Sequence, residues 1–206
     1  AHRFLFGARD PVLPMALACA LCLLGLRVLE RLEWVAPGVP EPRVLGRLAI
    51  LGAALALPVV VIDVFGAFPA EMNVCLPDAL LFYPSIAVVA ESTFHVVPLA
   101  AVGLIARATA AARGGRGGLR AAWVVAAAGA SLIEPALQVA WGLTRSPLWA
   151  NAYVGVHLLA FNAIGVWLIR RHGFAAVWCY RMSYYLIWHV AWGVLRLELL
   201  FGAPPG

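Results

Sequence analysis

Ionisable side chains lie deep inside long apolar stretches of this sequence, at spacings that could support acid–base chemistry. Glu91 and His95 are four residues apart, so on a helix they share one face. Glu134 and Gln138 have the same spacing. Later apolar stretches of the chain contain His157, Arg181, Tyr185 and His189.

A buried carboxylate can take a proton from water, and nearby donors can stabilise the oxyanion that forms. In such a reaction Glu91 or Glu134 would be the base, and His157 would orient the water. His189 or Arg181 would face the oxyanion. We therefore take as candidate catalytic residues Glu91, Glu134, His157 and His189, with His95, Gln138, Arg181 and Tyr185 in support.

The same side chains allow two other interpretations. Two glutamates and two histidines can bind a divalent metal, so the candidate ligands are again Glu91, Glu134, His157 and His189. Histidines in apolar helices could also bind a haem or chlorophyll, but the chain has no c-type haem motif, and a tetrapyrrole is disfavoured. A purely structural role, in which such pairs hold helices together, stays open, and it is the preferred interpretation of Asp63.

The composition indicates the elements that must position these groups. Of 206 residues, 64% are hydrophobic and only 12% are charged, whereas a soluble domain carries about 25% charged residues. This balance excludes a soluble enzyme, a disordered tail and a nucleic-acid-binding module. It indicates an all-α, polytopic membrane protein.

Six apolar runs are long enough, or nearly so, to span a bilayer, which takes about 20 residues of helix. They cover residues 11–29, 45–66, 77–106, 121–143, 149–170 and 173–201. We expect two parts: residues 1–76, with two helices and a Pro-rich cytoplasmic loop, and residues 77–206, with a four-helix core. Because a charge in hydrocarbon costs roughly 3 kcal/mol or more, the ionisable groups should face the interior of that core.

The arginines predict the orientation, since basic residues mark cytoplasmic loops. The chain has no lysine, and its net charge is +5. Ten arginines fall on the side of the loops near residues 27–47, 107–120 and 170–171; the other side has four, which are Arg3, Arg9, Arg145 and Arg196. We expect a multi-pass protein of the cell inner membrane with both termini outside the cytoplasm and the Gly-Arg linker, residues 113–120, inside.

Several strings resemble those of the CAAX-prenyl-protease and bacteriocin-processing (CPBP) family of intramembrane glutamate proteases. The family motif EExxFRG is similar to residues 90–96, where Glu91 and Phe94 are kept, Ala90 replaces the first Glu and His95 replaces the Arg. Residues 161–173 resemble the family stretch FxxGxxxGxLxxRxG. The last motif, HxxxN, is matched by His189, with Gly193 in place of the Asn.

A second register is open. The family motif FxxxH has no His on residues 121–143, the run after Glu91. It could instead be Tyr153 to His157, with Glu134 then taking the place of the Glu motif. We prefer the first register.

The resemblance covers roughly residues 77–193 and implies a four-helix core with peptidase activity on a membrane-anchored peptide. The family uses its first Glu to activate water, and Ala90 stands there in the preferred register. A non-catalytic relative, serving as a subunit or scaffold among other membrane subunits, is the main alternative. A membrane protein that binds a metal or tetrapyrrole is another.

Overall fold

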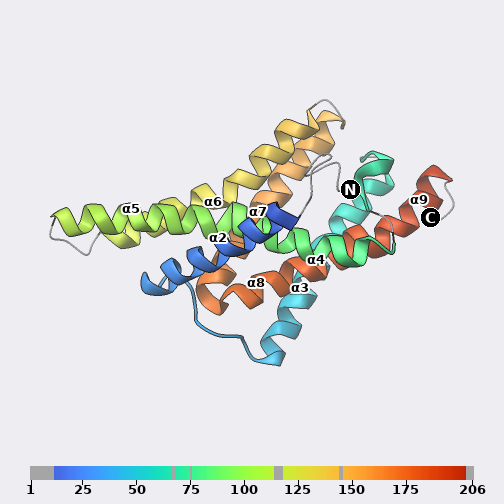
Figure 1. Ribbon diagram of the computed structural model, residues 1–206. Helices are drawn as coiled ribbons and strands as arrows, with labels where there is room; N and C mark the ends of the chain where they lie inside the picture. The colour runs from blue at the N-terminus through green and yellow to red at the C-terminus, as the bar shows by residue number, and fades with distance from the viewer. Residues whose placement is uncertain (1–11, 66–67, 75, 114–117, 144–145, 203–206) are drawn as a thin grey trace.

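Six long helical segments run back and forth in the parts of the chain that the structure describes (Figure 1). The computed structural model describes residues 12–65, 68–74, 76–113, 118–143 and 146–202. These ranges contain no strand. The elements are α2 (Val12–Arg31), α3 (Pro42–Val64), the short 3-10 helix η1 (Ala70–Met72), α4 (Ala79–Ala90), η2 (Glu91–Val96), α5 (Val97–Arg113), α6 (Gly118–Gly142), α7 (Leu148–His172), α8 (Phe174–Tyr185), η3 (Leu186–Ala191) and α9 (Trp192–Phe201).

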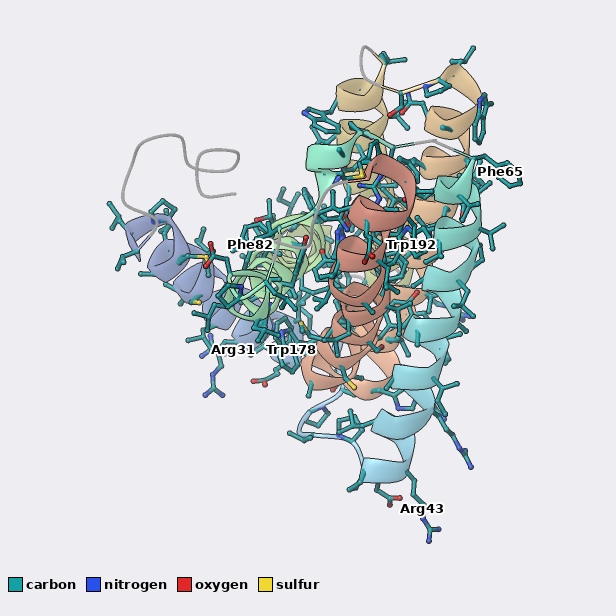
Figure 2. The ribbon with its side chains drawn as sticks, turned by 90° about the vertical axis from the view of Figure 1, so that its right-hand side faces the viewer. Arg31, Arg43, Phe65, Phe82, Trp178 and Trp192 are labelled. Atoms are coloured by element: carbon teal, nitrogen blue, oxygen red, sulfur yellow. The ribbon has the colours of Figure 1, made fainter. Side chains whose placement is uncertain are left out.

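The helices confirm an all-α polytopic bundle. Five of them are long and apolar enough to cross a membrane: Val12–Arg31, Pro42–Val64, Ala79–Ala110, Leu119–Gly142 and Leu148–His172. The sixth segment runs without a break through α8, η3 and α9. Apolar side chains project outward along the bundle (Figure 2). Leu81 and Val156, for example, are 80% and 72% exposed. A surface this apolar faces lipid, so the chain is a multi-pass integral membrane protein.

The helix bounds agree with the six predicted runs to within a few residues, except that α5 continues to Arg113. Parts of the topology prediction lie outside the described residues. These are the N-terminal segment up to residue 11, residues 114–117 of the Gly-Arg linker, Arg145 and the last four residues.

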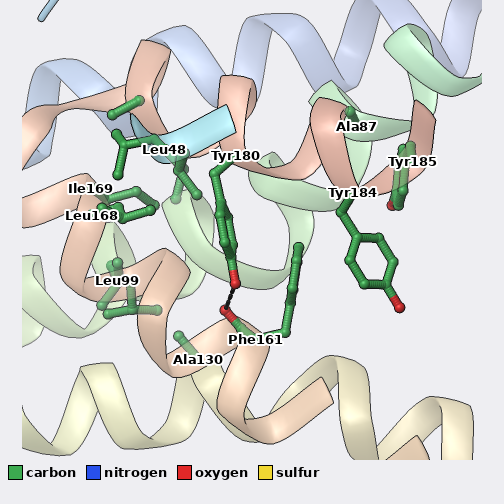
Figure 3. Close-up of a cluster of buried hydrophobic side chains, with 14 of the residues drawn as sticks. Leu48, Ala87, Leu99, Ala130, Phe161, Leu168, Ile169, Tyr180, Tyr184 and Tyr185 are labelled. Atoms are coloured by element: carbon green, nitrogen blue, oxygen red, sulfur yellow. Dashed lines mark hydrogen bonds between the residues drawn. The ribbon is translucent and has the colours of Figure 1, made fainter. Parts of the chain in front are cut away.

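Both N-terminal helices pack onto the remaining segments. The helix α3 lies along α8, whereas α2 crosses α5 and η2 (Figure 1). Within the later part of the chain, α6 packs against both α5 and α7, and α7 packs against α8. The buried side chains between them include Leu99, Ala130, Phe161 and Tyr180, whose hydroxyl donates to the Phe161 carbonyl at 3.3 Å (Figure 3).

The reversal between α7 and α8 depends on one glycine. Gly173 has a φ of +81°, a left-handed conformation that other residues adopt with strain. A Cβ at this position would also lie 2.6 Å from the Ala36 carbonyl oxygen. The loop after α2 therefore packs directly on the end of α7, where the Ala36 N–H donates to the Ile169 carbonyl at 3.3 Å.

Two segments change from α-helix to π-helix, and both carry polar residues of the predicted site. At the end of η2 the Val97 N–H donates to the Ser92 carbonyl, and at the end of η3 the Trp192 N–H donates to the Ile187 carbonyl. Both bonds span five residues, as in a π-helix. Pro98 contributes to the first, because it has no N–H to donate to the Phe94 carbonyl. The hydropathy pattern predicts neither π segment.

Candidate functional site

Arg181 of α8 is the centre of a buried polar network. Its side chain is 1% exposed and donates from Nε to a carboxylate oxygen of Glu91 on η2. The Nη1 and Nη2 groups donate to the two oxygens of Glu134 on α6, at 3.2 and 3.1 Å. Further bonds reach Asn162 Oδ1 at 3.1 Å and the Tyr185 hydroxyl at 3.3 Å. A guanidinium has a fixed fork of five donors, and this one is shared among four helical segments.

The carboxylate of Glu91 is enclosed on both sides. One oxygen accepts from Arg181, and the other lies 2.6 Å from His95 Nδ1. Both Glu91 and His95 are fully buried. The remaining nitrogen of His95, Nε2, has no hydrogen-bond partner. Beside the ring is Gly165, where a Cβ would lie 3.4 Å from His95 Cε1.

Arg181 also forms part of the wall of a small cavity of about 120 Å³. Glu134 forms part of its wall, and Gln138 lies on the same wall with an exposed side chain. The other groups around it come mainly from α7, α8 and η3: Tyr153, His157, Phe161, Tyr184, Tyr185, Trp188 and His189. The cavity is thus an aromatic chamber with one carboxylate and two imidazoles.

Each imidazole of the chamber is held by stacking and has one free buried nitrogen. His157 lies between Tyr153 and Tyr184, with ring centroids 5.4 and 5.9 Å away. His189 stacks on Tyr83 at 4.6 Å. His157 Nε2 and His189 Nδ1 have no hydrogen-bond partner. Buried polar atoms normally find one, so these nitrogens are available to a bound molecule or water.

The structure divides the predicted residues into two groups that share Arg181. Glu134, His157 and His189 line the chamber, together with Gln138, Arg181 and Tyr185 of the supporting set. Glu91 and His95 are not among the residues that line it. Among the described residues, the hydrogen bonds of the Glu91 carboxylate connect it to the chamber through the guanidinium of Arg181.

The four candidate metal ligands are not gathered around one point in this structure. Across the described ranges, no three or more His, Cys, Asp or Glu side chains are grouped so as to hold an ion. Both glutamates form ion pairs with Arg181.

Asn162 was not among the predicted site residues, although it belongs to the network. Its Oδ1 accepts from Arg181, and it is fully buried while its Nδ2 has no partner. The signal was present in the sequence, since an amide within an apolar run faces the same desolvation cost as a charge.

A second buried ion pair lies at the C-terminal end of α3. Arg196 of α9 binds the two oxygens of Asp63 at 2.6 and 2.9 Å, and Trp192 Nε1 donates to the same carboxylate at 2.7 Å. Arg196 also donates to the carbonyls of Phe68 and Pro69. The arginine count includes Arg196 among the four arginines of the outer side. Its side chain is fully buried in the bundle and paired with Asp63.

No protein-family model, no curated protein and no solved structure matches the chain.

Proposed function

We propose that this protein is a divergent, non-catalytic relative of the CPBP intramembrane proteases that serves as a subunit or scaffold of a larger membrane complex. The observation that carries the proposal is the engagement of both buried glutamates by Arg181. A glutamate protease needs a carboxylate whose lone pairs are free to accept a proton from water.

Both glutamates are instead held in ion pairs by the same guanidinium. Glu91 has one oxygen on Arg181 and the other on His95, and it is fully buried. Glu134 reaches the chamber, yet both of its oxygens accept from the guanidinium. The polar groups therefore act as a clamp that joins η2, α6, α7 and α8.

The departures from the family motifs support the same conclusion. Ala90, at the position of the water-activating Glu, is buried and offers no polar group. Gly193, at the position of the final Asn, leaves a space that Asn73 enters from the loop after α3. A Cβ at Gly193 would lie 2.6 Å from Asn73 Nδ2. That amide donates to the backbone carbonyls of Trp188 and His189 instead of facing the chamber.

One observation favours an active membrane peptidase as the second candidate. Glu134, His157 and His189 line a single cavity, and each imidazole has a free nitrogen there. If a substrate displaced Arg181 from Glu134, these groups would form a base and two donors around one water. The second candidate thus requires a rearrangement of the ion pair, and the first does not.

A cleavage assay separates the candidates. The purified protein is reconstituted with a membrane-anchored, prenylated peptide, beside the variants Glu91→Gln and Glu134→Gln. Glutamine keeps the shape of the side chain but cannot act as a base. We expect no cleavage by the wild type above the level of either variant, together with a lower unfolding temperature for both variants.

Asp63→Asn is the matched control, because it removes a buried carboxylate that is not among the residues lining the chamber. It should lower the unfolding temperature and leave cleavage unaffected. Cleavage by the wild type that is lost in both Gln variants but kept in Asp63→Asn would overturn the proposal and establish the peptidase. Extraction in a mild detergent tests the scaffold directly: a particle no larger than the 22.0 kDa chain and its micelle contradicts it.

A further inference from the structure

A second, larger cleft of about 730 Å³ lies between α6 and α7. Its surface is mostly apolar, with small side chains that leave room between the helices: Ala127, Ala128 and Ala163, flanked by Leu132, Leu159 and Trp167. In Figure 1 the two helices lie together near their hairpin, whereas towards its N-terminus α6 runs beside α5 and α7 leads to α8. The cleft shares none of its residues with the chamber.

One end of this cleft is strongly basic. Arg170 and Arg171, from the last turn of α7, belong to its wall, and both are exposed. The guanidinium of Arg170 lies 4.6 Å above the Trp123 ring. Neither arginine forms an ion pair with a described carboxylate. The cleft therefore combines an apolar floor with a positive charge that no carboxylate of the described chain compensates.

Two tryptophans, Trp123 and Trp167, line the cleft together with these arginines. Trp123 is buried against Arg170, whereas Trp167 is 56% exposed. Tryptophan is enriched at the boundary between headgroups and hydrocarbon. The arginine count predicts that this end of α7 is cytoplasmic, and the cytoplasmic leaflet is rich in anionic lipid.

We propose that the cleft between α6 and α7 binds one phospholipid with an anionic headgroup. Its phosphate lies against Arg170 and Arg171, and an acyl chain lies along Ala127, Ala128 and Ala163. Charge complementarity selects this occupant over a transmembrane helix of another protein, because an apolar helix in the cleft would cover the two arginines without a counter-charge. The proposal does not depend on whether the protein is a scaffold or a peptidase.

Native mass spectrometry measures the bound lipid directly. The full-length protein in detergent is incubated with phosphatidylglycerol or phosphatidylcholine of identical acyl chains, and the lipid-bound fraction is recorded. We expect the wild type to retain phosphatidylglycerol about tenfold more than phosphatidylcholine, since each basic group near an anionic surface contributes modestly and two act together. Arg170→Gln/Arg171→Gln should abolish the preference.

Arg43→Gln/Arg47→Gln is the matched control, because it removes two exposed arginines from the first turns of α3, near the same side of the protein. It should keep the preference. Ala163→Leu, which narrows the cleft without changing charge, should lower the bound fraction of phosphatidylglycerol. If the double variant of α7 unfolds, Arg171→Gln alone replaces it, and it should weaken the preference severalfold.

Three results would overturn the proposal. Equal retention of the two lipids by the wild type would show that the arginines do not select a headgroup. An equal loss in the α3 control would show a general charge effect instead of a site. A particle with the mass of two chains that disappears in Ala163→Leu would show that a second copy occupies the cleft.

Discussion

At the scale of single residues, Arg181 determines what the buried carboxylates can do. A lone carboxylate or guanidinium in a low-dielectric interior carries a desolvation cost of several kcal/mol. Here one guanidinium binds both Glu91 and Glu134. It also donates hydrogen bonds to Asn162 Oδ1 and to the Tyr185 hydroxyl. The cost of each charge is thereby offset by its neighbours, which explains how the bundle tolerates both glutamates.

Removing this guanidinium should be strongly destabilising. Arg181→Met leaves two buried carboxylates without a counter-charge, and we expect a loss of about 3 kcal/mol or more in the free energy of unfolding. Arg181→Lys keeps the charge but not the fork, so its loss should be smaller. The unfolding temperature of the purified variants in detergent is the measurement.

A charge-free version of the network supplies the control for that prediction. In Glu91→Gln/Glu134→Gln/Arg181→Met all three charges are absent, and stability should recover relative to Arg181→Met alone. A triple variant that is no more stable than Arg181→Met would indicate that packing, not charge, explains the loss.

At the scale of elements, the loop between α3 and α4 braces the π segment of the last span. Asn73 donates from Nδ2 to the carbonyls of Trp188 and His189, at 3.2 and 3.3 Å, where the wide π turn leaves backbone acceptors accessible. Gly193 makes this approach possible, because a side chain there would collide with the amide. The loop thus fixes the backbone that carries His189.

Asn73 and Gly193 should therefore be energetically coupled. We expect Asn73→Ala to cost about 1–3 kcal/mol, because buried acceptors lose their donor. Gly193→Ala should also destabilise the protein, through the collision. In the Asn73→Ala background the same Gly193→Ala change should cost less, since the amide is gone and the nearest remaining side-chain atom of residue 73, its Cβ, lies 3.2 Å from the added methyl group.

A double-mutant cycle on unfolding temperatures tests this coupling. Additive effects of the two changes would contradict it, because residues in contact normally show an interaction of about 0.5–3 kcal/mol.

At the scale of the whole molecule, two separate buried ion-pair networks tie the helices of the bundle together. The Arg181 network ties the middle of the bundle, and the Asp63–Arg196 pair ties α3 to α9. Apolar side chains cover the outside, and Arg43 and Phe65 mark opposite ends of α3 (Figure 2). These two networks are the buried ion pairs that join separate helices within the described residues.

The arginines predict the orientation of this bundle, and labelling can test that prediction. In a variant without the four native cysteines, Val39→Cys lies in the loop between α2 and α3, and Asp78→Cys lies just before α4. Both positions are exposed. A membrane-impermeant thiol reagent added to intact cells should modify Asp78→Cys and leave Val39→Cys unmodified until the cells are lysed. The reverse pattern would invert the topology.

The sequence by itself determined the class of the protein and most of its helices. Hydropathy alone is sufficient for this, because about 20 apolar residues must cross the bilayer as helix. It also indicated that the buried ionisable groups face inward, since the cost of exposing a charge to lipid does not depend on the details of packing. The i,i+4 spacing of Glu91 and His95 predicted that they share a face, and their 2.6 Å contact is a local consequence of that spacing.

Only the tertiary structure decided which partner each charge takes. The contacts of Arg181 with Glu91 and Glu134 join residues 90 and 47 positions apart, and the contact of Arg196 with Asp63 joins residues 133 apart. Such pairings depend on how α3, α6 and α8 are arranged, which a hydropathy pattern does not encode. The π turns and the entry of Asn73 beside Gly193 have the same origin, because each is a backbone adjustment to a neighbour far along the chain. The step from a set of candidate catalytic residues to an ion-paired clamp therefore required the packed bundle, where a single guanidinium reaches both glutamates.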